Sequence, residues 1–338
     1  MNKKRVLAML LAGAMALSMT ACGGNSASTD DSSNDGGASA SGGSYKVSVI
    51  LKTLAAEYWQ YVKSGAEDYA SEHSDKVTVE VKGPSSETAF DEMQNMIETD
   101  LSSGSYDGVI ISPLQSDTAA QLVSGTKLPI VAIDTNFTAP EVKSFVGTGN
   151  EAAAKKGGEA AVEAAKAAGW TDIKCIEIAG VQGDQTNTAR RNGYKAGVEE
   201  AGGTFLSDEV QYADATADRA TTAMEAIMQT HPEGIAIICA NNDDMAMAAA
   251  RAAQGHDAYK NTIFLGFNGD RAACEAILAG QMTMSVAQMA YEMGYKAVET
   301  MVQVLDGETV DEFVDSGSDV VTPDNAQERL DTLKTQLH

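Results

Sequence analysis

The chain has 338 residues, of which 43% are hydrophobic, and its 48 acidic residues outnumber its 24 basic residues to give a formal net charge of −24. This charge argues against nucleic acid and anionic membrane surfaces as partners, because either would require basic patches. The length fits two compact domains better than a single core.

Residues 1–21 have the pattern of an export signal peptide. Four basic or polar residues follow Met1 and precede an apolar run over 6–19, which is shorter than the roughly 20 residues needed to cross a bilayer. The stretch 17–22 resembles a bacterial lipoprotein box, with Met19 where the usual box has Leu. We expect cleavage before Cys22 and lipidation of its thiol. Ordinary secretion with an unmodified Cys22 is the alternative.

A flexible linker is expected to follow the lipidated cysteine, so that 22–44 forms a tether. Residues 23–44 contain only Gly, Ser, Ala, Asn, Asp and Thr, which leaves almost nothing to bury and little backbone stiffness. The three later cysteines, Cys175, Cys239 and Cys274, are odd in number and do not indicate a disulfide framework. We interpret them as small core residues.

From Tyr45 almost to the end of the chain, strand-like runs alternate with helical patterns. In the first half, strands are predicted at 46–51, 77–81, 108–111 and 130–134, with helices at 58–69 and 91–101. In the second half, strands are predicted at 173–178, 204–210, 235–239, 262–266 and 282–286, with helices starting at Thr188, Asp218, Asp243, Arg271 and Tyr291. This alternation predicts an α/β fold of two doubly wound parallel-sheet lobes.

The residues that follow the predicted strands share a chemistry. Ligands of such sheets bind outside the carboxyl ends of the strands. Small or hydrogen-bonding residues follow most strands: Lys52-Thr53, Gly83-Pro84-Ser85, Ser112-Pro113, Asp134-Thr135-Asn136, Asn241-Asn242-Asp243, Asn268-Gly269-Asp270 and Gln288. Few of them are nucleophiles or bases, so the pattern favours binding over catalysis.

In this arrangement the sequence resembles the ribose/galactose type of periplasmic binding protein, the type 1 class, from about Val47 to Val304. The resemblance lies in stretches that occur in the family's order: Leu54–Trp59 with Gly65-Ala66, Ile110–Pro113, Pro129–Asp134, Ala189–Tyr194, Ala240–Ala246, Gly266–Gly269 and Val286–Gln288.

The resemblance implies two lobes joined by a three-strand hinge, which close on a ligand. The N-terminal lobe would comprise 45–148 plus 289–318, and the C-terminal lobe 149–288 plus 319–338. The expected hinges lie near 148–150, 286–289 and 317–321.

The resemblance also implies a set of ligand-binding residues. Tyr58 and Trp59 match an aromatic pair whose rings suit the C–H face of a sugar. Asp134, Arg190, Asn242 and Gln288 match polar positions that bind hydroxyls. We add Lys52, Thr135 and Asn268 at the ends of strands. Each assignment has a structural alternative. The aromatic pair could pack its helix, and Asp134, Asn242 and Asn268 could cap helices or form turns. Gln288 could form hydrogen bonds in the hinge, and Arg190 could form a surface ion pair with Asp184.

The sequence departs from a ribose-binding pattern at four positions. That pattern would have Asn at Ala56, Arg at Thr135, Phe at Ala215 and Asp at Asn268. These changes indicate a different or larger ligand, and Lys52 would offer it a cation. A furanosyl autoinducer, sugar acids and polyols therefore stay open.

A dinucleotide-dependent oxidoreductase is the main rival class, because residues 147–152 fit the pattern G-x-G-x-x-A. The motif lies at the expected first hinge crossing instead of in the opening βαβ unit, which argues against that class. The four histidines form no H-x-x-x-H pair, and no G-x-S-x-G motif occurs. We expect no enzyme activity, no cofactor and no metal.

The sequence therefore predicts an exported binding protein, lipid-anchored at the outer face of the cell membrane. It would capture a monosaccharide or similar polyhydroxylated molecule and deliver it, as a monomer, to an ABC permease and its ATPase. A sensor for a furanosyl autoinducer or nucleoside that feeds a receptor kinase would use the same lobes and stays open as the alternative.

Overall fold

The computed structural model describes residues 44–337. The expected signal peptide, Cys22 and all of the linker except Ser44 lie outside the described residues. Within the described range, none of the helices combines the length and the apolar character that crossing a bilayer requires.

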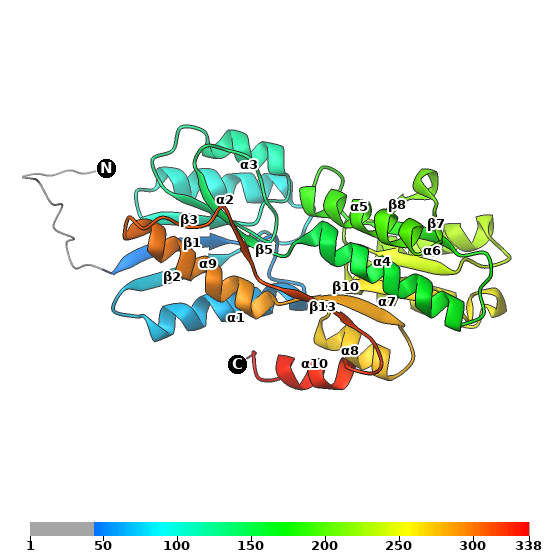
Figure 1. The fold of residues 1–338 in the computed structure, drawn as a ribbon. Coiled ribbons are helices and arrows are strands. Elements are labelled where there is room, and N and C mark those ends of the chain that lie inside the picture. Colours follow the sequence, from blue (N-terminus) through cyan, green and yellow to red (C-terminus); the bar gives the residue numbers. More distant parts are fainter. Residues whose placement is uncertain (1–43, 338) are drawn as a thin grey trace, which may run out of the picture. The chain divides into compact units, whose positions relative to one another are not determined.

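Six strands form the first sheet, which together with its covering helices we call the N-terminal lobe (Figure 1). All neighbouring strands are parallel, in the order β12-β5-β4-β3-β1-β2. The strands are β1 (Tyr45–Ile50), β2 (Val77–Lys82), β3 (Gly108–Ile111), β4 (Ile130–Ile133), β5 (Val142–Gly147) and β12 (Phe313–Asp315). The strand order reverses between β1 and β3, which is the kind of switch point where open parallel sheets bind ligands.

Helices cover both faces of this sheet because alternate strand residues point to opposite sides. Val49 belongs to the core under α1 (Glu57–Glu72) and α9 (Ala290–Leu305). Its neighbour Ile50 belongs to the core under α2 (Phe90–Ser102) and α3 (Ser116–Val123).

The second sheet forms the C-terminal lobe in the same way. Its order is β13-β11-β10-β9-β6-β7, with β8 also paired to β6, and every pair is parallel except β13 with β11. The strands are β6 (Lys174–Ala179), β7 (Thr204–Phe205), β8 (Gln211–Tyr212), β9 (Ile237–Ala240), β10 (Ile263–Asn268), β11 (Met284–Gln288) and β13 (Ser318–Val321). The predicted α/β class with two parallel-dominated sheets is thereby confirmed.

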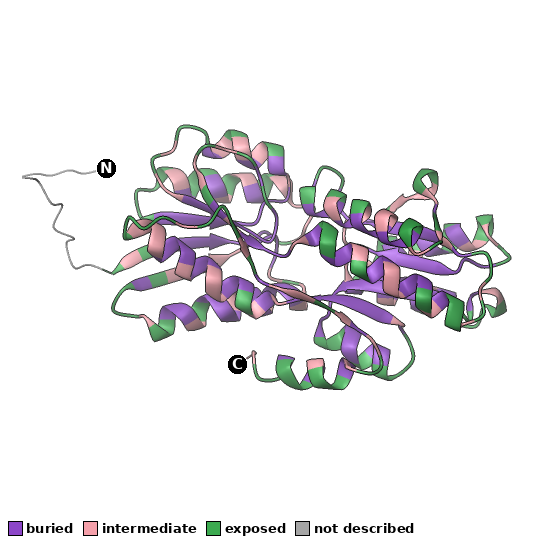
Figure 2. Ribbon diagram, viewed as in Figure 1, coloured by how far each residue is buried: buried purple, intermediate pink, exposed green. Residues whose placement is uncertain are grey.

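Two groups of helices enclose the second sheet, and Figure 2 shows buried strands beneath helices whose outer surfaces are exposed. One face carries α4 (Asn150–Ala167) and α5 (Gln185–Glu200). The other face carries α6 (Ala217–Thr230), α7 (Asp243–Ala253) and α8 (Arg271–Leu278), and α10 (Ala326–Leu333) packs on α8.

The chain passes between the two sheets three times. It crosses at 148–149 between β5 and α4, at Met289 between β11 and α9, and at 316–317 between β12 and β13. Two crossings contact each other, because the hydroxyls of Thr148 and Ser316 lie 3.3 Å apart. The C-terminal segment thus contributes β12 to one sheet and β13 to the other.

One predicted strand is wrong. Residues 204–210 were expected to form a single strand, but the structure has the two-residue β7, a 3-10 turn at Ser207–Glu209 and then β8. The turn residues are polar and exposed, and the segment lies at the edge of the sheet, where few neighbours hold a strand straight.

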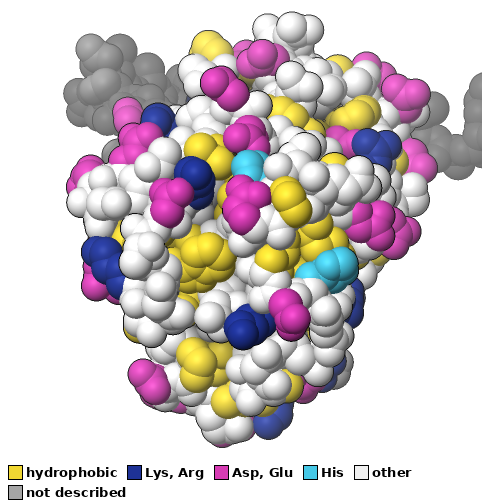
Figure 3. Space-filling model, turned by 90° about the vertical axis from the view of Figure 1, so that its right-hand side faces the viewer, with side chains coloured by type: hydrophobic (Ala, Val, Ile, Leu, Met, Phe, Trp, Pro, Cys, Tyr) yellow, Lys and Arg dark blue, Asp and Glu magenta, His cyan; other side chains and the backbone are white. Residues whose placement is uncertain are grey.

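The surface agrees with the acidic composition. On the face of the C-terminal lobe shown in Figure 3, acidic and basic side chains are interspersed, and no broad basic patch is seen among the described residues on that face. A nucleic-acid footprint would require such a patch.

Replacing Gly65 with alanine is expected to destabilise the N-terminal lobe, because α1 and α9 approach closely at this residue. A Cβ atom on Gly65 would lie 2.0 Å from the carbonyl oxygen of Tyr291 in α9. Alanine gains about 1 kcal/mol of helix propensity, but overpacking against a backbone that cannot easily move costs about 1–3 kcal/mol, so we expect a net loss of stability. Urea denaturation measures this loss.

Gly149→Ala is the steric control, since a Cβ atom there meets nothing within 4 Å, but Gly149 is the N-cap of α4 and its replacement loses only the capping preference for glycine over alanine. A Gly65→Ala protein as stable as the wild type would contradict the close contact of α1 with α9.

Candidate ligand-binding site

A cavity lined by side chains of both lobes lies where strands of both sheets end. All of the predicted site residues except Thr135 line it. The lining residues are Lys52, Ala56, Tyr58, Trp59, Glu87, Asp134, Thr186, Arg190, Asn241, Asn242, Asp244, Asn268 and Gln288.

The aromatic pair lies in the first turn of α1, directly after the loop that leaves β1. Tyr58 and Trp59 are both buried, and their rings meet edge to face with centroids 4.9 Å apart. Each polar end has a carboxylate partner: the Tyr58 hydroxyl donates to Asp134 Oδ1 at 2.8 Å, and the Trp59 Nε1–H donates to Glu87 Oε1 at 3.0 Å. The two rings therefore have fixed orientations at the cavity wall.

Asp134 follows β4, is buried at the cavity wall and has polar partners at both carboxylate oxygens. Its backbone has φ 61°, in the left-handed region that most residues avoid. Besides Tyr58, the Thr135 hydroxyl donates to its Oδ2 at 3.0 Å. Thr135 also lies 2.6 Å from the hydroxyl of Thr186 in the C-terminal lobe, so its position is at the lobe contact and not at the cavity wall.

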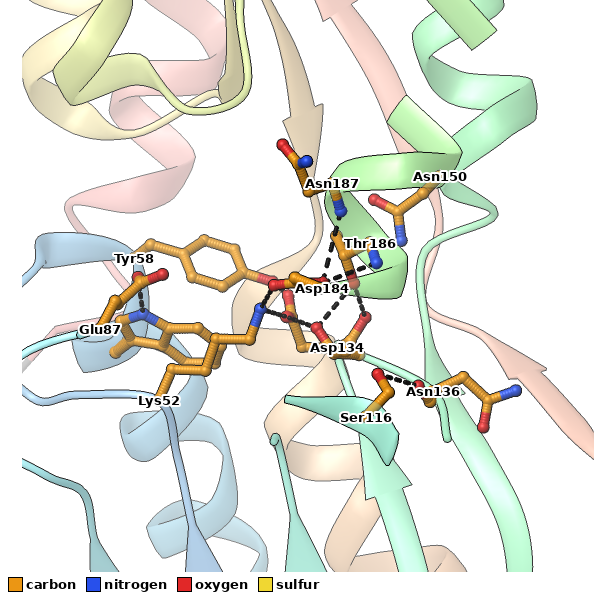
Figure 4. Close-up of polar contacts among 12 residues, drawn as sticks. Lys52, Tyr58, Glu87, Ser116, Asp134, Asn136, Asn150, Asp184, Thr186 and Asn187 are labelled. Carbon is orange, nitrogen blue, oxygen red and sulfur yellow. Dashed lines mark hydrogen bonds and ion pairs between the residues drawn. The ribbon is translucent and has the colours of Figure 1, made fainter. Parts of the chain in front are cut away.

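Lys52 joins the two lobes through buried carboxylates. Its ammonium contacts Asp184 of the C-terminal lobe and lies 3.8 Å from Asp134 Oδ2 of its own lobe (Figure 4). Burial by itself would lower the pKa of Lys52, but the negative charges of Asp184 and Asp134 outweigh that effect and raise it. Lys52 therefore stays charged and is already paired.

Asp184 is the N-cap of α5, and this fixes the carboxylate that Lys52 meets. Its Oδ1 accepts hydrogen bonds from the backbone N–H groups of Thr186 and Asn187 at 2.7 and 3.3 Å. The N-terminal end of a helix also favours a negative charge. The interaction with Lys52 thus uses the oxygen that capping leaves free.

Arg190 is buried, and the expected alternative of a surface pair with Asp184 does not occur. Its Nε donates to Asn150 Oδ1 at 2.8 Å, one terminal nitrogen donates to the Asn241 carbonyl at 2.7 Å, and the guanidinium lies 3.8 Å from the centroid of the Phe267 ring. Its neighbour Arg191 is half-buried and pairs with the buried carboxylate of Glu177.

Two amides at the ends of β10 and β11 bond to each other. Gln288 Nε2 donates to Asn268 Oδ1 at 3.0 Å, and Asn268 has φ 135°, a strained value. Gln288 is fully buried, yet its Oε1 has no hydrogen-bond partner among the described residues. A buried acceptor without a partner costs free energy, so it marks a place where a ligand donor would be stabilised.

Asn242 caps a helix, which is the structural alternative expected from the sequence, and it also lines the cavity. It is the N-cap of α7 and accepts from the Met245 N–H at 2.9 Å, while its Nδ2 donates to the Ala215 carbonyl at 3.1 Å. Ala215 adopts a left-handed φ of 59°, which aims that carbonyl at Asn242.

Sequence reasoning did not single out Glu87, Thr186 or Asp244 as lining residues. Glu87 lies in the loop after β2, and Asp244 directly follows Asp243 at the start of α7, so proximity to a strand end is the signal that could have found both. Thr186 follows Asp184 in the first turn of α5.

The remaining sequence expectations concern metals, cysteines and the glycine motif. Among residues 44–337, no group of three or more His, Cys, Asp or Glu side chains is placed to hold a metal ion. Cys175, Cys239 and Cys274 are free and buried. Residues 147–152 lead from β5 across to α4 at the first crossing between lobes, away from the opening βαβ unit.

Comparisons with known proteins agree with this architecture. The D-allose-binding periplasmic protein of Escherichia coli K12 is 30% identical over 265 residues, which cover 75% of this chain and 83% of that protein. The ribose import binding protein of the same strain is 27% identical over 268 residues, covering 78% and 86%.

A solved structure shows the same fold: the carbohydrate transporter solute-binding protein of Agrobacterium radiobacter, in complex with D-arabinose. It has a TM-score of 0.77 and 23% identity, and the match covers 87% of this chain and 99% of that one. These relatives are substrate-binding transport proteins, and the chain is accordingly a binding protein and not an enzyme.

A family model described as the periplasmic binding protein domain matches residues 47–309. Because this match spans most of both lobes, the chain belongs to the periplasmic binding protein domain family.

Proposed function

We propose that this protein is the exported substrate-binding subunit of an ABC importer and captures a monosaccharide or similar polyhydroxylated molecule between its lobes. The observation that carries the proposal is the buried cavity lined by hydrogen-bonding side chains from both sheets. The names of the relatives, which bind ribose and allose, support the same ligand class.

The chemistry of the cavity suits a molecule with several hydroxyl groups. Asp134 and Gln288 offer acceptors, and Arg190 has terminal N–H groups beyond those bonded to Asn150 and Asn241. Tyr58 and Trp59 add aromatic surface beside these polar groups. A sugar presents both kinds of surface, since its C–H faces alternate with hydroxyls.

Contacts between the lobes support closure as the mechanism. Lys52 reaches Asp184, Thr135 meets Thr186, and at the rim Arg271 Nε lies 3.2 Å from Glu57 Oε1. In the proposed cycle these contacts form as the lobes close over the ligand, and the closed form is presented to the permease.

Export and anchoring complete the proposal. The signal peptide and the lipoprotein box at Cys22 would leave a mature protein tethered at the outer face of the cell membrane. Labelling with a fatty-acid analogue, lost in Cys22→Ser, tests the anchor.

A thermal-shift screen of the purified protein against monosaccharides, polyols, sugar acids and nucleosides is expected to give a hit among the sugars. A ligand at 100 times its Kd adds about 2.7 kcal/mol to stability. Asp134→Asn keeps the shape and tolerates the left-handed backbone, but it removes the charge, so we expect binding to weaken by about 1.5–3 kcal/mol, roughly 10- to 100-fold.

Arg190→Gln is expected to weaken binding as strongly, whereas the exposed Arg219→Gln is the control with the same chemical change. A response only to nucleosides or to a furanosyl autoinducer would keep the fold and overturn the proposed ligand.

Lys52→Met is expected to weaken ligand binding by roughly tenfold or more. Removing one partner of a buried ion pair costs about 3–5 kcal/mol. In this protein, opening of the lobes would return Asp184 and Asp134 to water. The substitution should therefore make lobe closure less favourable without lowering the free energy of unfolding. Calorimetry measures the affinity, and small-angle scattering measures the radius of gyration, which should increase. Lys63→Met, at an exposed pair with Glu67, is the control. Unchanged affinity and scattering in Lys52→Met would show that this ion pair does not hold the lobes together.

A further inference from the structure

The cavity contains more negative charge than its cations balance. Lys52 and Arg190 are the positive groups of its lining. The negative groups are Asp134, Glu87 and Asp244 in the lining and Asp184, which contacts Lys52. Two of these carboxylates already contact Lys52. The Lys52 ammonium is therefore not available to an anionic ligand without breaking its contacts to Asp184 and Asp134.

Among the lining carboxylates, Glu87 and Asp244 have no cation at contact distance within the described residues, and Glu87 is the one beside the aromatic pair. It lies in the loop between β2 and α2, and its Oε1 accepts the hydrogen bond from Trp59 Nε1. Glu87 is half-buried, and its Oε2 makes no hydrogen bond within residues 44–337. Burial raises the pKa of Glu87, and Lys52 opposes this rise only in part. Figure 4 shows Glu87 near Tyr58 and Lys52, at the aromatic side of the cluster.

A second unpartnered acceptor lies in the same cavity but comes from the other lobe. Gln288 Oε1 is fully buried and receives no hydrogen bond among the described residues, while its amide nitrogen is bonded to Asn268. The buried Gln288 Oε1 requires a donor, and Glu87 Oε2 is free to accept one. The unused hydrogen-bonding atoms in the cavity are therefore mostly acceptors, which favour a ligand rich in donors. The free N–H groups of Arg190 are the donors that remain.

We propose that Glu87 is a specificity-determining residue that accepts a hydrogen bond from a hydroxyl or amino group of the ligand beside Trp59. Its negative charge would weaken the binding of sugar acids. This assignment rests on the proposed function. A ligand carboxylate placed here would meet a second carboxylate, and like-charge contacts of this kind discriminate between otherwise similar ligands. The expectation that Lys52 offers a cation to a sugar acid is thereby replaced.

The test is calorimetric titration of the purified protein with matched sugar series: D-glucose, D-glucosamine and D-glucuronate; D-galactose, D-galactosamine and D-galacturonate; and D-ribose with D-ribonate. In the series that binds, the wild type should prefer the neutral or amino form over the acid by at least tenfold. Tighter binding of the amino form would identify an ammonium as the donor, and tighter binding of the neutral form would identify a hydroxyl.

Glu87→Gln keeps an acceptor for Trp59 and removes the charge, so it should reduce the preference over the acid by at least tenfold while the neutral sugar still binds. Glu98→Gln makes the same chemical change at an exposed position of α2 and should leave the preference unchanged.

Two failures are distinguishable. If a neutral sugar binds but the acid binds equally well, or if Glu87→Gln leaves the preference intact, the role of Glu87 is wrong while the proposed function stands. If no member of any series binds, the proposed function and the role of Glu87 fall together.

Discussion

The carboxyl ends of two parallel sheets face each other across this molecule, and the rest of the structure depends on that constraint. Parallel strands place their following loops at one edge, and the three crossings at 148–149, 289 and 316–317 bring the two edges together. Residues distant in sequence, such as Lys52 after β1 and Asp184 after β6, meet only because of it. One sheet could not by itself enclose a small polar molecule on both sides.

Buried charge is the second constraint, and it explains why the cavity is so heavily hydrogen-bonded. A charged group removed from water is tolerated only when it is paired. Lys52 has Asp184 and Asp134, Arg190 has Asn150, Asn241 and the Phe267 ring, and Asp184 also caps α5. The atoms left over, above all Gln288 Oε1, are those that a ligand would satisfy. In the proposed function, the network that joins the lobes also determines which ligands fit.

Local patterns in the sequence were sufficient to predict the α/β class and most of the strands, because strands and helices alternate along the chain. Polar residues after strands predicted part of the cavity edge, whereas Tyr58, Trp59 and Arg190 were predicted from the resemblance to the binding-protein family. The partners of those residues were harder to predict. The Lys52 contact with Asp184 spans the two lobes, and Glu87 belongs to a loop with no regular pattern. Strands β12 and β13 are short and pair with distant segments, while α3 begins with polar residues that resemble a loop.

A crystal structure of the protein grown with the sugar that stabilises it most would show whether the ligand lies in this cavity. We predict one sugar molecule between the lobes, with hydroxyls bonded to Asp134, Arg190 and Gln288 Oε1 and a C–H face against Tyr58 or Trp59. A sugar bound outside this cavity, or one inside it that leaves Gln288 Oε1 without a donor, would show that the proposed site is wrong.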